Sequence, residues 1–361
     1  MRYHQLGLLH HDPARSFAGY TLVTPIRHTA VFLVDMDGQE VHRWELPGPL
    51  GSKAYLLPGG TLLFSTFTQE GTPIKEAKGG HIYEMDWDGK IVWEHVDHDQ
   101  HHDIRRLQNG NTVYIAWEEL SEPEQARVQG GIPGTERDGK TYADLFREVN
   151  PAGEVVWEWH LKDQVIEDFP LAADCERFEF AHSNSCAPMS DGNYLVNFRS
   201  LDTMGVIDRA SGEFILKRTD RHWEHPHNPD ILPNGNITFF ANGMYNPSQP
   251  LHSRAMEMNP ETGEIVWQYT DPQKWTFFSP IMGSVQRLAS GNTLTIPFTG
   301  ALSRLLMAEI WCGITSTRCF TTSRSSAARP IHCSAPTAMP VILQKSAGAS
   351  EPIQRRPYVL F

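Results

Sequence analysis

The first 300 residues alternate short apolar runs with turns that contain glycine. One recurring phrase is a turn followed by apolar alternation, as in "LQNGNTVYIAW" from Leu107, "LPNGNITFF" from Leu232 and "LASGNTLTI" from Leu288. A second phrase is a hairpin with its own glycine turn, as in "IYEMDWDGKIVWEHV" and "RAMEMNPETGEIVWQYT". Asn-Gly or Asp-Gly between alternating apolar residues is a strong hairpin signal, because both central residues take positive φ. The pattern predicts an all-β protein.

The second phrase recurs at a period that is typical of β-propeller blades. Its turn glycines are Gly38, Gly89, Gly153, Gly212 and Gly263, at intervals of 51, 64, 59 and 51 residues. Each interval holds four short strands, and a sixth repeat is due about fifty residues after the last glycine. We therefore predict a six-bladed β-propeller of four-stranded blades over residues 1–299. Tryptophans recur just after the turns and are expected to pack between neighbouring blades; they are Trp44, Trp93, Trp157 and Trp267.

The pattern stops where the sixth repeat is due. From Ala301 to Phe361 there are only two acidic residues, Glu309 and Glu351, of the 43 in the chain. If the codons of this region are read in a neighbouring frame, they can encode a segment whose residues follow the same order as Ser253–Pro272. We predict that residues 300–361 are translated out of frame, from a point between Leu294 and Ser303, and that this disrupts the last blade. The alternative is a genuine disordered tail rich in serine and alanine.

Composition narrows the classes of partner. The net charge of −12 disfavours nucleic acid and anionic membranes, which select basic surfaces. No window approaches eighteen consecutive apolar residues, and the N-terminal residues lack the apolar core of a signal peptide. We therefore expect a cytoplasmic protein with a small-molecule ligand. Cys175 and Cys186 are the two cysteines in the patterned region, too few for a disulfide framework.

Histidine is the conspicuous polar residue, with 17 in the chain. His102 and His227 stand seven residues before the turn asparagines of their blades, and His182 has a similar place in the blade between them. Equivalent positions on innermost strands converge on the central channel of a propeller. Arg199 follows the turn of the His182 blade and is expected at the same channel mouth. Guanidinium suits sulfate or phosphate oxygens and imidazole can be a nucleophile, so the set predicts a site for an anionic group.

As a set, these motifs resemble the bacterial arylsulfotransferases, nucleotide-independent aryl-sulfate sulfotransferases built on a six-bladed propeller. The resemblance runs from about Gly19 to Leu294. It is carried by "HHDIRRLQNGN", by "HSNS" followed by "NFRSLD", by "HNPDILPNGNITFFANG" and by "SRAMEMNPETGEIVWQY" with "GSVQRLASGNTL". It implies a ping-pong reaction in which a histidine takes a sulfuryl group from a phenolic sulfate ester and passes it to a phenol.

The resemblance also implies roles for individual residues. His227 matches the sulfurylated nucleophile, His182 and Arg199 would hold the sulfuryl oxygens, and His102 would assist the phenol oxygen. The implied partners are an aryl sulfate donor and a phenol acceptor, with no cofactor and no metal. Well-known members are exported and carry an extra N-terminal β domain, whereas this sequence shows no export signal. Substrate and compartment are therefore left open.

Other interpretations compete with this one. "GTERDGKT", Gly134–Thr141, matches the phosphate-binding expression G-x-x-x-x-G-K-[ST], but no helix is predicted after it, so we interpret residues 118–144 as a long loop inserted in one blade. Residues 97–103 and 222–227 offer imidazoles and carboxylates to a metal without the spacing of a dedicated site. A quinoprotein dehydrogenase, a non-catalytic propeller that binds a partner, and an inactive frameshifted product of such an enzyme are the remaining alternatives.

Overall fold

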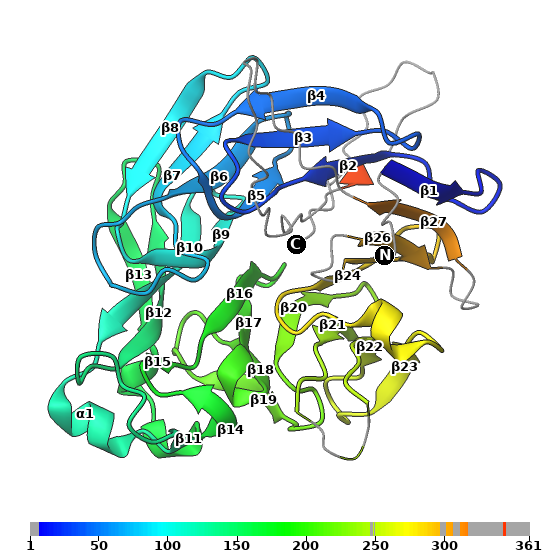
Figure 1. Cartoon of the computed structure of the whole chain (residues 1–361). Coiled ribbons are helices and arrows are strands. Elements are labelled where there is room, and N and C mark those ends of the chain that lie inside the picture. Colours follow the sequence, from blue (N-terminus) through cyan, green and yellow to red (C-terminus); the bar gives the residue numbers. More distant parts are fainter. Residues whose placement is uncertain are drawn as a thin grey trace, which may run out of the picture.

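The computed structural model describes residues 7–245, 248, 250–296, 301–305, 311–316 and 342–343. Its strands form antiparallel sheets arranged side by side around a common centre, as Figure 1 shows. The arrangement is that of a β-propeller, and the prediction of an all-β protein is confirmed. No helix in these ranges is both long enough and apolar enough to cross a membrane.

Five sheets carry the five sequence repeats. In the first, β28 (Ile342–Leu343), β2 (Tyr20–Val23), β3 (Ala30–Val34) and β4 (Glu40–Glu45) pair in that order. The second contains β5 (Leu50–Leu56), β6 (Leu62–Phe67), β7 (Gly80–Met85) and β8 (Ile91–Val96). The third contains β9 (Gln100–Arg106), β10 (Thr112–Glu119), β12 (Tyr142–Val149) and β13 (Val155–His160), with β15 (Glu179–Phe180) beside β12. The fourth contains β16 (Ser183–Pro188), β17 (Tyr194–Phe198), β18 (Thr203–Ile207) and β19 (Phe214–Thr219), and the fifth β20 (Pro226–Ile231), β21 (Ile237–Ala241), β22 (Arg254–Met258) and β23 (Ile265–Tyr269).

A further sheet lies between the fifth and the first. It joins β24 (Ser284–Arg287), β25 (Thr293–Ile296), β26 (Ala301–Leu305) and β27 (Trp311–Ser316) to β1 (Gly7–His11) from the start of the chain. The predicted number of six blades is not confirmed, because only five sheets have the four-stranded form of the repeats. The predicted out-of-frame region, residues 300–361, lies largely outside the described residues.

The recurring tryptophans pack between blades, as predicted. Trp44, Trp93 and Trp157 each lie on an outermost strand and donate the indole N–H to a backbone carbonyl in the outer turn of the next blade. Trp44 donates to Asp86 at 3.1 Å, and Trp93 donates to Pro151 at 2.9 Å. Trp157 continues the series with the carbonyl of Arg209 at 3.0 Å. A buried indole needs such a partner, so these bonds fix the register between neighbouring sheets.

Apolar side chains fill the space between adjacent sheets. One cluster joins Val113 and Phe146 of the third sheet to Val196 and Phe198 of the fourth, and all four are completely buried. A sheet that is covered on both sides needs apolar side chains on both of its faces, which explains fully buried strands such as β17. The sheets are therefore held to one another by side chains, and their inner edges meet around the centre.

The connection from β10 to β12 is not a simple loop. It contains the helix α1 (Glu122–Arg127) and the strand β11 (Gly130–Ile132), which pairs in parallel with β14 (Leu171–Glu176). The ends of the predicted loop, residues 118–144, belong to β10 and β12. The segment Gly134–Thr141 is followed directly by β12, so the helix that a phosphate-binding loop requires is absent there. The short 3-10 helices are η1 (Leu161–Asp163), η2 (Ile166–Asp168), η3 (Arg199–Leu201) and η4 (Lys274–Phe277).

A histidine-lined cavity as candidate active site

The innermost strands share a local irregularity that shapes the centre. A bulge interrupts the pairing of β9 with β10, of β16 with β17 and of β20 with β21. His102 in β9 and Asn228 in β20 adopt positive φ there, of 50° and 52°. A bulge re-aims the side chains beside it, and such left-handed residues gather at functional sites. The bulges therefore direct polar side chains of three blades toward the centre.

The four residues predicted from the sequence come together. His102, His182, Arg199 and His227 all line one cavity of about 440 Å³. Counting back from the turn glycines, His102 and His227 occupy the same repeat position, whereas that position in the blade between them is Asn184. His182 precedes Asn184 by two residues and reaches the cavity from the segment before β16. His102 and His227 are thus equivalent in the repeat, as predicted, whereas His182 is offset from that position by two residues.

His227 is held in one orientation by its Nδ1 atom. This atom lies 3.0 Å from the carbonyl oxygen of His225 and 2.7 Å from Oδ1 of Asn242. The amide of Asn242 cannot turn round, because its Nδ2 donates to the carbonyls of Ser279 and Met282, both at 2.7 Å. Two acceptors at Nδ1 place the proton of a neutral His227 there, so the lone pair is on Nε2.

Burial lowers the pKa of His227 well below its ordinary value, and the positive charge of Arg199 lowers it further. The imidazole is therefore neutral at pH 7. Its Nε2 atom accepts a long contact of 3.3 Å from the backbone N–H of Met282, another residue of the cavity wall. An unprotonated Nε2 beside a cavity is the requirement for a nucleophilic histidine.

His182 has a carboxylate partner. Its Nδ1 lies 2.7 Å from Oε2 of Glu179, which is buried and also accepts the indole N–H of Trp117 at 3.1 Å. Burial alone would raise the pKa of Glu179, but His182, His101 and the indole N–H of Trp117 together outweigh burial, and the pKa is lowered. The bond to Glu179 fixes the orientation of the His182 ring at the cavity wall.

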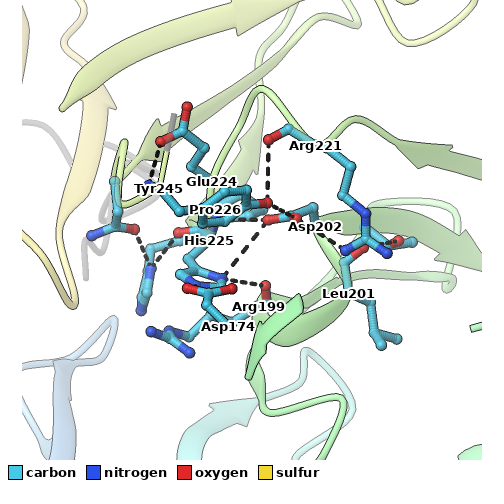
Figure 2. A network of polar contacts seen from close by, with 12 residues as sticks. Asp174, Arg199, Leu201, Asp202, Arg221, Glu224, His225, Pro226 and Tyr245 are labelled. Atoms are coloured by element: carbon cyan, nitrogen blue, oxygen red, sulfur yellow. Dashed lines mark hydrogen bonds and ion pairs between the residues drawn. The ribbon is translucent and has the colours of Figure 1, made fainter. Parts of the chain in front are cut away.

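Arg199 begins η3, directly after β17. Its carbonyl oxygen accepts from Nδ1 of His225 at 3.2 Å, and Figure 2 shows His225 beside Asp174 and Asp202. His225 Nε2 lies 2.9 Å from Asp174, and its backbone N–H donates to Asp202 at 2.7 Å. This network fixes the backbone that connects Arg199 to the strand of His227. No described side chain bonds the guanidinium of Arg199, which is free for a ligand.

His102 is buried among other basic side chains. Its pKa is lowered well below the ordinary value by burial first, and then by the neighbouring His182, His101, Lys53 and His227. Its ring meets that of His182 edge to face, with centroids 4.6 Å apart. A neutral imidazole at this position accepts or donates a single proton, as general acid–base catalysis requires.

Sequence reasoning missed a buried lysine. Lys53 lies on β5 and lines the cavity, where its Nζ donates to the carbonyl of Asn184 at 2.8 Å and lies 3.4 Å from Oδ1 of Asn228. Burial lowers the pKa of Lys53 to about 8, although Asp103 at 3.8 Å opposes the shift. The repeat register could have found it, because its neighbour Ser52 aligns with His102 and His227. The cavity lining thus carries an excess of cationic groups.

Two groups of side chains have the atom types of a metal site. They are His101 with His102 and Glu179, and Asp174 with Cys175 and His225. Members of both groups already bond to protein partners: His225 bonds to Asp174, and Glu179 bonds to His182. Cys175 and Cys186 are both free and buried.

A second cavity, of about 490 Å³, lies between the second and third sheets and is lined by acids such as Asp97, Asp99 and Glu118. Several of these acids are already paired, as Asp97 is with Arg147 at 2.6 Å and Glu118 with His160 at 2.9 Å. Its charge is opposite to what an anionic ligand needs. The histidine-lined cavity is therefore the better candidate.

The chain was compared with solved structures, with curated proteins and with models of protein families. A solved structure of a protein of unknown function from Bacteroides caccae superposes with a TM-score of 0.54 at 14% identity, over 83% of this chain and 94% of that one. Virginiamycin B lyase from Staphylococcus aureus superposes with a TM-score of 0.48 at 12% identity, over 86% and 88% of the two chains. No curated protein matches the sequence. The sequence model of the arylsulfotransferase (ASST) family matches residues 53–301, and the chain belongs to that family.

Proposed function

We propose that this cavity transfers a sulfuryl group from an aryl sulfate to a phenol through a covalent intermediate on His227. The observation that carries the proposal is the orientation of His227, whose Nδ1 is bonded by His225 and Asn242. The Nε2 lone pair then has only the long 3.3 Å contact with the N–H of Met282 to give up when a substrate binds beside Arg199 and His182, which line the same cavity. Membership in a family of transferases with small-molecule substrates supports the assignment.

In the first half-reaction, Nε2 of His227 attacks sulfur, the bond from sulfur to the aryl oxygen breaks, and its electron pair leaves with the phenolate. Negative charge stays on the sulfuryl oxygens throughout. Arg199 supplies positive charge toward those oxygens, which stabilises the transition state, and His182, oriented by Glu179, lies beside them in the same cavity. His102 gives a proton to the leaving phenolate or takes one from the acceptor phenol. In the second half-reaction an acceptor phenol attacks sulfur, and His227 is regenerated.

Two structural predictions accompany this proposal. We propose that the five-stranded sheet of β24–β27 with β1 is a sixth blade, and its pairing of both chain ends is the usual closure of a propeller. We also retain the proposal that residues 300–361 are out of frame. Resequencing the coding DNA across Gly291–Arg318 tests the latter, since a single-base insertion or deletion is expected and an unbroken frame would contradict it.

Initial-rate kinetics test the reaction. With 4-nitrophenyl sulfate as donor and phenol as acceptor, a covalent intermediate gives parallel double-reciprocal lines, and His227→Asn abolishes turnover. His222→Asn is the matched control, because His222 is close in sequence and its side chain is 79% exposed. A parent protein that folds but turns over no aryl sulfate would favour a non-catalytic propeller or an inactive product. Equal activity of His227→Asn and the parent would exclude the proposed nucleophile.

A further inference from the structure

Two buried residues behind His102 have no part in the chemistry above. His101 precedes His102 on β9, and Asp144 lies on β12; both side chains are completely buried. Nδ1 of His101 lies 2.7 Å from Nδ1 of His102, and Nε2 of His101 lies 3.2 Å from Oδ1 of Asp144. The ring of His101 stacks on Trp117, with centroids 3.9 Å apart and planes at 10°. The three side chains thus form a row from the core to the cavity.

The partners at each atom decide where the protons lie. Oδ2 of Asp144 accepts the backbone N–H of Ser183 at 2.7 Å. Oδ1 of Asp144 and Nε2 of His101 have no hydrogen-bond partner among the described residues, so the 3.2 Å approach of these two atoms to each other is an electrostatic contact and the nearest polar contact of either. A carboxylate only accepts, so the proton of a neutral His101 lies on Nε2 and its lone pair on Nδ1. His102 then donates from Nδ1, and its own lone pair is on Nε2, away from His101.

We propose that Asp144 and His101 are positioning residues that hold His102 in the tautomer whose Nε2 accepts the proton of the phenol acceptor. The inference rests on the proposed function and extends it. When the phenol oxygen bonds to sulfur, the sulfur–nitrogen bond breaks and its electron pair returns to Nε2 of His227. The phenolic proton passes to Nε2 of His102, which becomes an imidazolium. Its Nδ1–H still donates to His101, and the carboxylate of Asp144 faces the far nitrogen of His101.

The surroundings of His102 make this carboxylate important. Lys53 on β5, His182 before β16 and His227 on β20 all face His102 and oppose a positive charge on it. Glu179 is bonded to His182, and Glu76 is the one acid among the cavity-lining residues described. Asp144 is therefore the acid that is linked to His102 through His101, by an electrostatic contact of 3.2 Å and a hydrogen bond of 2.7 Å.

Asp144→Asn tests the relay because it reverses the direction of donation. The N–H of Ser183 still needs an acceptor, so the amide oxygen takes the place of Oδ2 and the amide N–H₂ faces Nε2 of His101. The proton of neutral His101 then moves to Nδ1, which donates to Nδ1 of His102. His102 must carry its own proton on Nε2, so an N–H faces the cavity instead of a lone pair. With 4-nitrophenyl sulfate as donor, we expect transfer to phenol to fall about 100-fold, the lower end of the contribution of general acid–base catalysis.

A second acceptor separates this role from a structural one. Pentafluorophenol is ionised at pH 7 and has no proton to give, so its rate should change by less than about 3-fold in Asp144→Asn. The ratio of the two rates does not depend on the fraction of folded enzyme. His101→Phe keeps the stacking on Trp117, removes both ring nitrogens and should show the same selective loss.

Glu148→Gln is the matched control. Glu148 is also a completely buried carboxyl on β12, but it bonds Tyr194 and Arg209 away from the cavity. Its substitution should leave the phenol-to-pentafluorophenol ratio unchanged. Equal losses with both acceptors in Asp144→Asn, or full retention of transfer to phenol, would overturn the relay. Failure of the parent to transfer to either acceptor would instead overturn the proposed function, and the relay with it.

Discussion

Replacing Arg199 with glutamine removes the guanidinium that lines the cavity and that, after burial, is the largest cause of the lowered pKa of His227. No described side chain bonds this guanidinium, so its loss leaves no buried carboxylate unpaired. The cost should therefore appear in catalysis and not in stability. Removing one donor from developing negative charge costs about 100- to 1,000-fold in rate, or about 2.7–4 kcal/mol.

The same substitution has a second effect, on pH dependence. Without the neighbouring positive charge the protonated form of His227 is less disfavoured, so its pKa rises toward the ordinary value. A histidine nucleophile is lost on protonation, so the acidic limb of the pH–rate profile should move to higher pH. Arg199→Lys keeps the charge but loses the fork-shaped donor set, so it should lower the rate while leaving the acidic limb in place.

The assay measures kcat/KM for 4-nitrophenyl sulfate with excess phenol between pH 5 and 9, over the range in which each variant melts as a folded protein. The account expects the rate order parent, Arg199→Lys, Arg199→Gln, with the limb displaced only in the last. An Arg199→Gln variant within a few-fold of the parent would refute the role in charge stabilisation. A limb at the same pH in both variants would refute the electrostatic coupling to His227.

Two further predictions concern stability. The pKa values of His102 and His227 are lowered well below the ordinary 6.5, so below pH 6.5 the unfolded chain binds protons that the folded chain excludes. The free energy of unfolding should therefore fall by up to about 2.7 kcal/mol per pH unit in that window. Denaturant unfolding at pH 7 and 5.5 measures it, and an unchanged midpoint would contradict the prediction. Gly283→Ala should be about 1–3 kcal/mol more destabilising than Gly192→Ala, because both glycines have positive φ but only at Gly283 would a Cβ lie 2.4 Å from Phe240; equal melting temperatures would show that the wall of the cavity adapts.

Much of the fold follows from local patterns in the sequence. The hairpin turns and the tryptophans after them recur at the period of a blade, and the indole bonds of Trp44, Trp93 and Trp157 explain why they recur. The helix and strand between β10 and β12 were not predicted, because β11 is a three-residue strand whose partner β14 is distant in sequence. Short elements of this kind depend on tertiary pairing and leave little local signal.

The site was predictable where the repeat carries it. His102 and His227 were predicted from their spacing in sequence to a turn glycine, and the structure places both at the same cavity. Lys53 was missed because lysine is usually exposed and its burial depends on acceptors from two other blades. Glu179, Asn242 and Asp144 were missed because their positions also depend on tertiary contacts. Their roles come from hydrogen bonds to residues that are not their repeat equivalents.

Trapping the intermediate tests the central claim most directly. The protein is mixed with 4-nitrophenyl sulfate in the absence of a phenol acceptor, quenched, digested and mapped by mass spectrometry. The account predicts a burst of 4-nitrophenol equal to the enzyme concentration and one SO₃ group on His227, with neither in His227→Asn and both in His222→Asn. Turnover to phenol with no label, or with the label on a residue other than His227, would contradict it.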